Sequence, residues 1–143
     1  MPDRVHNVLF LCTHNSARSQ LAEALLRHRA GDRYRVCSAG IEPGRVHPLT
    51  RRVLEEAGID ATGLEAKGLD AVLGKENVRT AIVVCAAAAE SYPRLYPFAR
   101  EVLQWPLDDP ARIEGSEELR LAAFRRTREE LDARLRDWLR AGG

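Results

Sequence analysis

The chain has 143 residues, 45% of them hydrophobic and 30% charged, which is typical of one globular domain, so we predict a single domain over residues 1–143. A net charge of +1 excludes a bulk electrostatic attraction to nucleic acid or to an anionic membrane. Without a signal peptide, a membrane-spanning run or a disulfide framework among its three cysteines, the chain is expected in the reducing cytoplasm.

The first predicted strand leads directly into the most informative segment of the chain. Residues 5–11 are an apolar run typical of a central parallel strand. Cys12 follows it, and Arg18 and Ser19 open a segment of helical periodicity at about residues 17–29. A tight loop between a strand and a helix can wrap an oxyanion, because the helix N-terminus offers backbone N–H groups and partial positive charge.

Three side chains in this segment suit attack on an oxyanion. Cys12 is the candidate nucleophile, because the field of the helix favours its thiolate. Arg18 offers a planar fork of donors to a tetrahedral anion, and Ser19 can donate to the thiolate. The alternative is a core cysteine at a strand end beside a solvated arginine. The residues expected to surround the oxyanion are Thr13, His14, Asn15, Ser16, Ala17, Arg18 and Ser19.

The remaining elements alternate between strands and helices. We expect strands at 34–38, 81–85 and 102–103, helices at 49–57 and from about 117, a short helix at 69–73, a helical turn at 86–90, and a loop around Pro93 and Pro97. This alternation predicts a right-handed α/β fold with helices on both faces of a parallel sheet. Ligands bind beyond the C-terminal strand ends of such sheets. Cys12, Ser38, Cys85 and the loop after Leu103 should therefore share one rim.

The segment from Cys12 to Gln20, continued by Leu21-Ala22-Glu23, resembles the phosphate-binding loop of the low-molecular-weight phosphatase superfamily. Further matches follow in family order at residues 38–43, 46–48, 58–60 and 105–111. Within the superfamily, the chain is more similar to the thioredoxin-coupled arsenate reductases than to the tyrosine phosphatases. The resemblance implies a three-layer sandwich around a four-stranded parallel sheet of order 2-1-3-4.

The resemblance also implies roles for single residues. Asp109, in Asp108-Asp109-Pro110, matches the general acid, and Pro110 helps to aim its carboxyl group. Asp-Pro is also a common turn. Asn15 matches a residue that holds the backbone of the loop, although an ordinary turn residue is the alternative. His14 stands where glycine is more common, so we interpret it as a variant in loop shape at a position suited to positive φ.

Cys85 separates a reductase from a hydrolase. In the reductases that the chain resembles, a second thiol attacks the nucleophilic cysteine, which releases arsenite and here would leave a Cys12–Cys85 disulfide. Bridging is expected to require movement after Cys85, and a buried strand cysteine is the alternative. Tyr92 stands where three-cysteine reductases have another cysteine. We therefore expect either an external thiol (thioredoxin, glutaredoxin or a small thiol) to reduce the Cys12–Cys85 disulfide directly, or a small thiol to attack the Cys12 adduct. We assign Cys37 to core packing.

The resemblance bears on metals as well. Glu23 and Ser38 match positions that help to build a potassium site behind the loop in some of these reductases. The later acidic position is Lys67 here. Its ammonium group could stand where the cation would lie, so we predict no metal and no bound cofactor. The alternative for Glu23 is a solvated position on the helix.

The leading hypothesis is therefore a thiol-linked arsenate reductase that binds arsenate or a phosphate-type oxyanion. The alternative is a low-molecular-weight phosphatase that acts on phosphotyrosine or aryl phosphates through a Cys12 phosphocysteine. Those phosphatases usually have cysteine at Ala17, proline at Gln20 and aromatic residues at 111–112, none of which this chain has. Tyr92 and Tyr96 could still line a cleft for an aryl group.

A third hypothesis is a non-catalytic module that only binds oxyanions. It is disfavoured because Cys12, Arg18 and Asp109 occur together.

Overall fold

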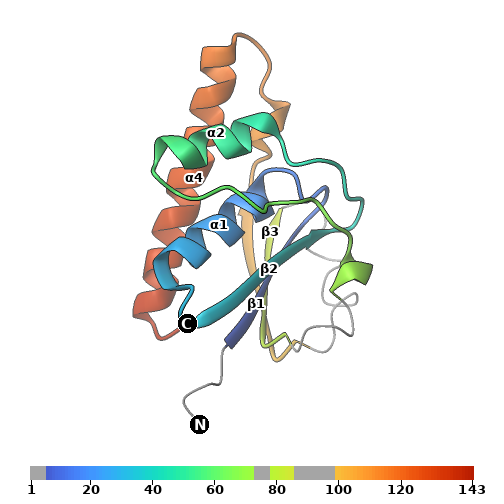
Figure 1. Cartoon of the computed structure of the whole chain (residues 1–143), viewed down its shortest axis with the longest axis vertical. Coiled ribbons are helices and arrows are strands. Elements are labelled where there is room, and N and C mark those ends of the chain that lie inside the picture. Colours follow the sequence, from blue (N-terminus) through green and yellow to red (C-terminus); the bar gives the residue numbers. More distant parts are fainter. Residues whose placement is uncertain (1–5, 73–77, 86–98) are drawn as a thin grey trace.

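A four-stranded parallel sheet lies at the centre of the computed structural model (Figure 1), which describes residues 6–72, 78–85 and 99–143. Its strands are β1 (His6–Cys12), β2 (Tyr34–Gly40), β3 (Thr80–Cys85) and β4 (Glu101–Leu107). They pair in the order β2-β1-β3-β4, and all pairs are parallel. The predicted sheet and its strand order are confirmed.

Both faces of the sheet are covered. Phe10 of β1 pairs with Ile82 of β3, so these side chains point to the same face. The Phe10 ring lies 6.5 Å from Trp105, which lies 6.5 Å from Trp138 of the last helix. Leu9, on the opposite face, is also fully buried. Burial on two sides explains why residues 8–12 of β1 and 81–85 of β3 are continuously apolar instead of alternating.

Three α-helices are described: α1 (Arg18–Ala30), α2 (Pro48–Glu56) and α4 (Glu117–Arg140). The helix α1 packs on β1 and β2, and it also contacts α4 and α2 (Figure 1). Two 3₁₀ turns complete the described elements, η1 (Leu69–Ala71) and η2 (Pro110–Arg112). Within the described part of the chain, no helix is both long and apolar enough to cross a membrane.

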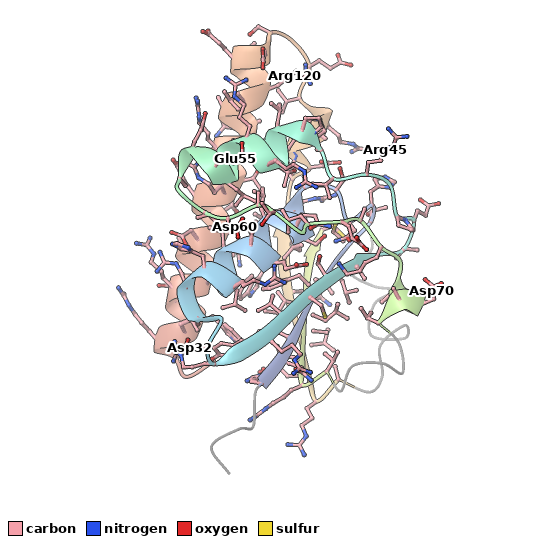
Figure 2. All side chains as sticks on the ribbon, viewed as in Figure 1. Asp32, Arg45, Glu55, Asp60, Asp70 and Arg120 are labelled. Carbon is pink, nitrogen blue, oxygen red and sulfur yellow. The ribbon has the colours of Figure 1, made fainter. Side chains whose placement is uncertain are left out.

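Ion pairs and surface charges surround this core. Arg125 of α4 binds Glu56 through two nitrogens, at 2.8 and 2.6 Å, and so joins α4 to α2. Arg29 of α1 binds Asp132 of α4 in the same way, at 2.6 and 2.8 Å. Figure 2 shows the charged side chains projecting from the outer surfaces of helices and loops, Arg120 of α4 among them.

The predicted elements differ from the structure mainly at their ends. The strand expected at 102–103 runs from Glu101 to Leu107, because an edge strand tolerates the missing N–H of Pro106. The short helix expected at 69–73 is the 3₁₀ turn η1. The helical turn at 86–90 and the loop around Pro93 and Pro97 lie outside the described residues.

Candidate active site

The predicted rim is formed by the C-terminal ends of the strands. Cys12 ends β1, Cys85 ends β3, and Asp109 lies two residues beyond the end of β4. Two adjacent hollows open here, of about 250 and 190 Å³. Both are lined by His14, Arg18 and Asp109.

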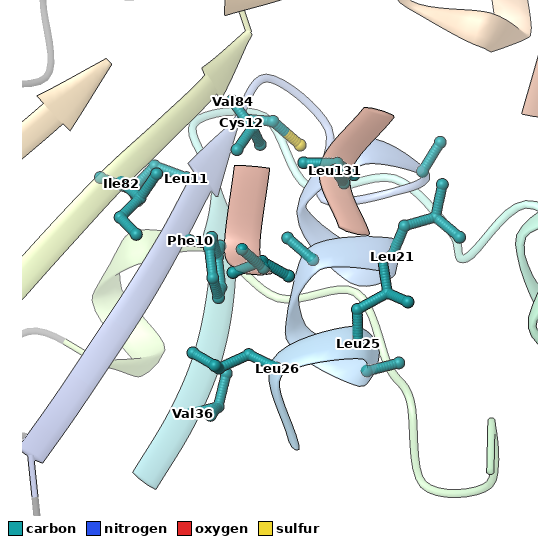
Figure 3. Close-up of a cluster of buried hydrophobic side chains, with 14 of the residues drawn as sticks. Phe10, Leu11, Cys12, Leu21, Leu25, Leu26, Val36, Ile82, Val84 and Leu131 are labelled. Atoms are coloured by element: carbon teal, nitrogen blue, oxygen red, sulfur yellow. The ribbon is translucent and has the colours of Figure 1, made fainter. Parts of the chain in front are cut away.

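The side chain of Cys12 faces polar groups although the residue is only 2% exposed. Its Sγ lies 2.8 Å from the Ser19 hydroxyl and accepts the Asn15 backbone N–H at 3.2 Å. Figure 3 shows the sulfur at the end of β1, pointing toward α1. The N-cap of α1 is Ala17, which provides no side-chain cap, so the positive end of the helix stays available to an anion.

The loop carbonyl groups are turned outward onto the segment after β2. Carbonyls of Cys12, Thr13 and His14 accept the N–H groups of residues 41, 42 and 44, at 3.3, 2.8 and 2.9 Å. The Ser16 carbonyl accepts from the backbone N–H of His47 at 3.1 Å. A loop held by its carbonyl groups presents its N–H groups to the enclosed space, which is how a backbone nest binds an anion.

Asn15 holds the loop in shape. Its Nδ2 donates to the hydroxyls of Ser19 and Ser38, at 2.8 and 2.9 Å, and its Oδ1 accepts from Gln20 Nε2 and the Lys67 N–H, both at 2.9 Å. Asn15 has a φ of 52°, and it is the only residue other than glycine with positive φ in the described part of the chain. The expectation that His14 takes this conformation is therefore wrong. His14 is exposed and lies 3.0 Å, through Nδ1, from the Glu42 carbonyl oxygen.

Arg18 and Asp109 face each other across the mouth of the loop. Arg18 Nη1 donates to the Leu107 carbonyl at 3.1 Å, and Nη2 lies 3.7 Å from Asp109 Oδ2. The other carboxylate oxygen, Oδ1, accepts the Ala111 N–H at 3.0 Å and caps η2. This cap and Pro110 orient Asp109 toward Arg18. Asp108 is exposed and lines only the larger hollow.

The three cysteines have different environments, and no disulfide joins any two of them. Cys85 is fully buried, and the Thr13 hydroxyl donates to its Sγ at 3.8 Å. By the alternation of β3, Cys85 lies on the opposite face of the sheet from Cys12. Cys37, in β2, is half-buried against the core, with its Sγ 3.7 Å from the Val8 carbonyl oxygen.

The sequence did not assign a role to His47, which supports the loop from outside. Its Nδ1 accepts the Leu49 N–H at 3.0 Å and caps α2. Its ring centroid lies 4.7 Å from that of Phe124 in α4. Burial lowers the pKa of His47, Arg120 lowers it further, and Asp109 opposes them. The available signal was proline at the first helical position, which favours a cap just before it.

A metal centre built from side chains is not found in the described ranges, where no group of three or more His, Cys, Asp or Glu residues could hold an ion.

Comparison of the sequence with protein families gives a match over nearly the whole chain. The model described as "Low molecular weight phosphotyrosine protein phosphatase" matches residues 7–141. An arsenate reductase of Bacillus subtilis is 36% identical over 135 residues, which are 94% of this chain and 96% of that protein. Arsenate reductase 1 of Bacillus cereus is 35% identical over 136 residues, 94% of this chain and 95% of its own length.

Solved structures agree with the sequence matches. An arsenate reductase in the phosphate-binding state superposes with a TM-score of 0.81 at 26% identity, covering 96% of this chain and 98% of that one. A thioredoxin-dependent arsenate reductase of Corynebacterium glutamicum gives a TM-score of 0.73 at 28% identity, over 99% of this chain and 63% of its own. A tyrosine phosphatase of Erwinia amylovora, 21% identical with a TM-score of 0.78 over 96% and 93% of the two chains, shares the fold.

Proposed function

The chain belongs to the low molecular weight phosphotyrosine protein phosphatase family, and from this membership we propose that it is a thiol-linked arsenate reductase. We choose a reductase because a second thiol, that of Cys85, lies at the rim close to Cys12. Cys85 Sγ accepts the hydroxyl of Thr13, the residue directly after the candidate nucleophile. Hydrolysis of a phosphate ester has no use for this thiol, whereas reduction of arsenate requires one.

In the first step, the Cys12 thiolate attacks the arsenic atom of arsenate. An S–As bond forms, an As–O bond breaks, and the departing oxygen leaves as water after taking protons. Arg18 and the inward N–H groups of residues 13–19 bind the remaining oxygens. Asp109, which lines both hollows, is the candidate general acid. Arsenic remains As(V) in this step.

In the second step, the Cys85 thiolate attacks Cys12 Sγ. The S–S bond forms as the S–As bond breaks, and its electron pair stays on arsenic, which leaves as arsenite. Two thiols are oxidised while As(V) becomes As(III). The Thr13 hydroxyl, which donates to Cys85 Sγ, holds this second sulfur beside the residue that follows Cys12. Because the two thiols start on opposite faces of the sheet, the segment that carries Cys85 must move for the disulfide to form.

The resulting disulfide must be reduced by an external thiol. Thioredoxin is the first candidate, because one structural relative is described as thioredoxin-dependent, and glutaredoxin or a small thiol are the others. Tyr92, at the position of a third cysteine, lies outside the described residues. We place the protein in the cytoplasm, where thiols are kept reduced, because its chemistry requires free thiols at Cys12 and Cys85.

A phosphatase is the second candidate, favoured by the family and by Asp109 at the mouth of the loop. Small and cationic side chains are prominent in the described lining of the two hollows. Gly44, Arg45, Ala111 and Arg112 border the hollows, and none of the described lining residues is Phe, Tyr or Trp. Tyr92 and Tyr96, which the sequence offered for a cleft around an aryl group, lie outside the described residues. Figure 2 shows Arg45 on the loop between β2 and α2.

Steady-state assays with arsenate and with an aryl phosphate separate the two functions. The purified protein receives arsenate with thioredoxin, glutaredoxin or a small thiol, and separately p-nitrophenyl phosphate. We expect arsenite release that is lost in Cys85→Ser and kept in Cys37→Ser, the matched control. Rapid phosphate hydrolysis that is unchanged in Cys85→Ser, without arsenite release by any thiol, would establish the phosphatase instead.

A further inference from the structure

A carboxylate that the reaction does not use is buried directly behind the oxyanion loop. Glu23 of α1 is 4% exposed. Its Oε1 accepts the hydroxyl of Ser38 at 2.5 Å, and its Oε2 accepts Arg27 Nη2 at 2.6 Å. Lys67 Nζ lies 3.9 Å from Oε1. A buried carboxylate is unfavourable unless it is paired and hydrogen-bonded, so these two cations keep Glu23 compatible with its site.

An unbroken series of hydrogen bonds joins this carboxylate to the candidate nucleophile. Ser38, bound to Glu23, accepts from Asn15 Nδ2 at 2.9 Å. Asn15 Nδ2 also donates to Ser19 Oγ at 2.8 Å, and Ser19 Oγ lies 2.8 Å from Cys12 Sγ. A Ser38 hydroxyl that donates to Glu23 must accept from Asn15. Glu23 therefore orients the Ser38 hydroxyl, which in turn accepts one hydrogen of Asn15 Nδ2, and the second hydrogen of the same nitrogen is donated to Ser19, the neighbour of Cys12.

The potassium site implied by the family resemblance does not fit these residues. Both oxygens of Glu23 are already engaged, by Arg27 and by Ser38. Asn15 Oδ1, another oxygen at this site, already accepts two N–H groups. A cation needs free oxygen ligands, and here it would also meet the positive charges of Arg27 and Lys67.

We propose that Arg27 and Lys67 are an internal, covalently attached substitute for a bound cation, and that they position the loop for the Cys12 thiolate through Glu23. They are positioning residues, because neither lines the hollows at the loop. The protein then needs no potassium for nucleophile reactivity. The inference rests on Cys12 being the nucleophile, whichever oxyanion it attacks.

The test follows alkylation of Cys12 instead of turnover. Peptide mass spectrometry measures the rate at which iodoacetamide labels Cys12 from pH 5 to 9, in potassium chloride and in tetramethylammonium chloride of equal ionic strength. For the wild type we expect the same profile in both salts. For Arg27→Gln/Lys67→Met we expect a midpoint at higher pH and labelling at pH 6.5 that is slower by about tenfold, as a shift of roughly one pH unit gives.

Two variants control for charge and for folding. Arg27→Lys keeps the positive charge and should keep the wild-type profile. Arg52→Gln removes a comparable cation, since Arg52 is 51% exposed against 49% for Arg27, and both pair with a glutamate at 2.6 Å. It should have no effect. If the double variant does not fold, the single variants Arg27→Gln and Lys67→Met are measured in the same way, each with a smaller expected shift.

Three results would overturn the proposal. One is faster labelling of Cys12 in the wild type in potassium chloride than in tetramethylammonium chloride, because the site would then still use a free ion. Another is a wild-type profile in the double variant and in both single variants. The third is a labelling rate of Cys12 that falls equally at every pH in the double variant, since such a fall indicates only a damaged loop. Failure of arsenate reduction would leave this measurement unaffected, so the two proposals fail separately.

Discussion

At the scale of single residues, the contacts around Cys12 depend on one hydroxyl. Ser19 Oγ lies 2.8 Å from Cys12 Sγ and accepts from Asn15 Nδ2, so its own proton is directed to the sulfur. The backbone N–H of Asn15 is the second donor.

Ser19→Ala removes this donor while leaving the fold intact. A hydrogen bond to a charged group contributes about 1.5–3 kcal/mol, so we expect the arsenate-dependent rate to fall by roughly ten- to a hundredfold. Single-turnover kinetics of the first step measure the effect, and thermal unfolding shows that the variant is folded. An unchanged single-turnover rate would contradict the role of Ser19.

Gly40→Ala should displace the loop. A Cβ at Gly40 would lie 2.8 Å from both the Asn15 nitrogen and the Thr13 carbonyl oxygen, and these backbone atoms have no room to retreat. We expect a loss of about 1–3 kcal/mol of stability together with most activity. Gly44→Ala is the matched control, because its nearest neighbour would be at 3.9 Å. Equal effects of the two variants, measured by urea unfolding and activity, would refute this account.

Motif order was enough to predict which residues lie together at the rim. Cys12, Arg18, Ser19 and Asp109 stand near one another as the sequence indicated. The sequence could not show that Arg27 pairs with a buried carboxylate, because a Glu and an Arg four residues apart are common on exposed helix surfaces. Only the burial of Glu23, which depends on tertiary packing, distinguishes this pair. The catalytic roles themselves stay predictions.

At the scale of elements, strand and helix cores were predictable and their ends were not. Apolar runs gave β1 and β3, and helical spacing gave α1, α2 and α4. The length of β4 was missed, because Pro106 reads as the end of a strand when its position at the sheet edge is unknown. The start of α2 was missed by one residue, since the His47 cap depends on its ring orientation.

The cap of α2 makes stability depend on pH. Because the folded-state pKa of His47 lies below its ordinary value of 6.5, the unfolded chain takes up a proton first as the pH falls. Stability is therefore fully present above about pH 6.5 and is lost as the pH falls through the lowered value. A protonated His47 also cannot accept the Leu49 N–H through Nδ1.

His47→Asn keeps an acceptor at the cap but does not titrate. Urea unfolding at pH 7.5 and 5.5 should show a smaller loss of stability for the variant than for the wild type. Stability still depends on pH in both proteins, because burial and Arg79 also lower the pKa of His6, while Glu101 opposes them. An equal loss in the two proteins would exclude His47 as a cause.

At the scale of the whole molecule, the parallel sheet and the shared rim followed from general rules for alternating strands and helices, whereas the strand order was implied by the family resemblance. Alternating elements and right-handed crossovers leave few topologies. The family resemblance selected among them the order that the structure has. What these rules could not supply is the contact of distant segments, such as the Arg125–Glu56 pair between α4 and α2.

The core that supports this arrangement can be tested on α4. Leu131 is fully buried, whereas Leu119 on the same helix is 59% exposed. We expect Leu131→Ala to lower the free energy of unfolding by about 2–5 kcal/mol through lost burial and a cavity. Leu119→Ala should change it by less than about 0.5 kcal/mol. Similar values for the two variants in urea titrations would mean that α4 is not packed as described.

The alternation of side chains along β3 has a consequence for the resting protein. In the proposed reductase, Cys12 and Cys85 lie at the ends of neighbouring strands with their side chains on opposite faces of the sheet, so the resting thiols are not placed to bond directly. The disulfide is postponed until the chain around the second thiol has shifted.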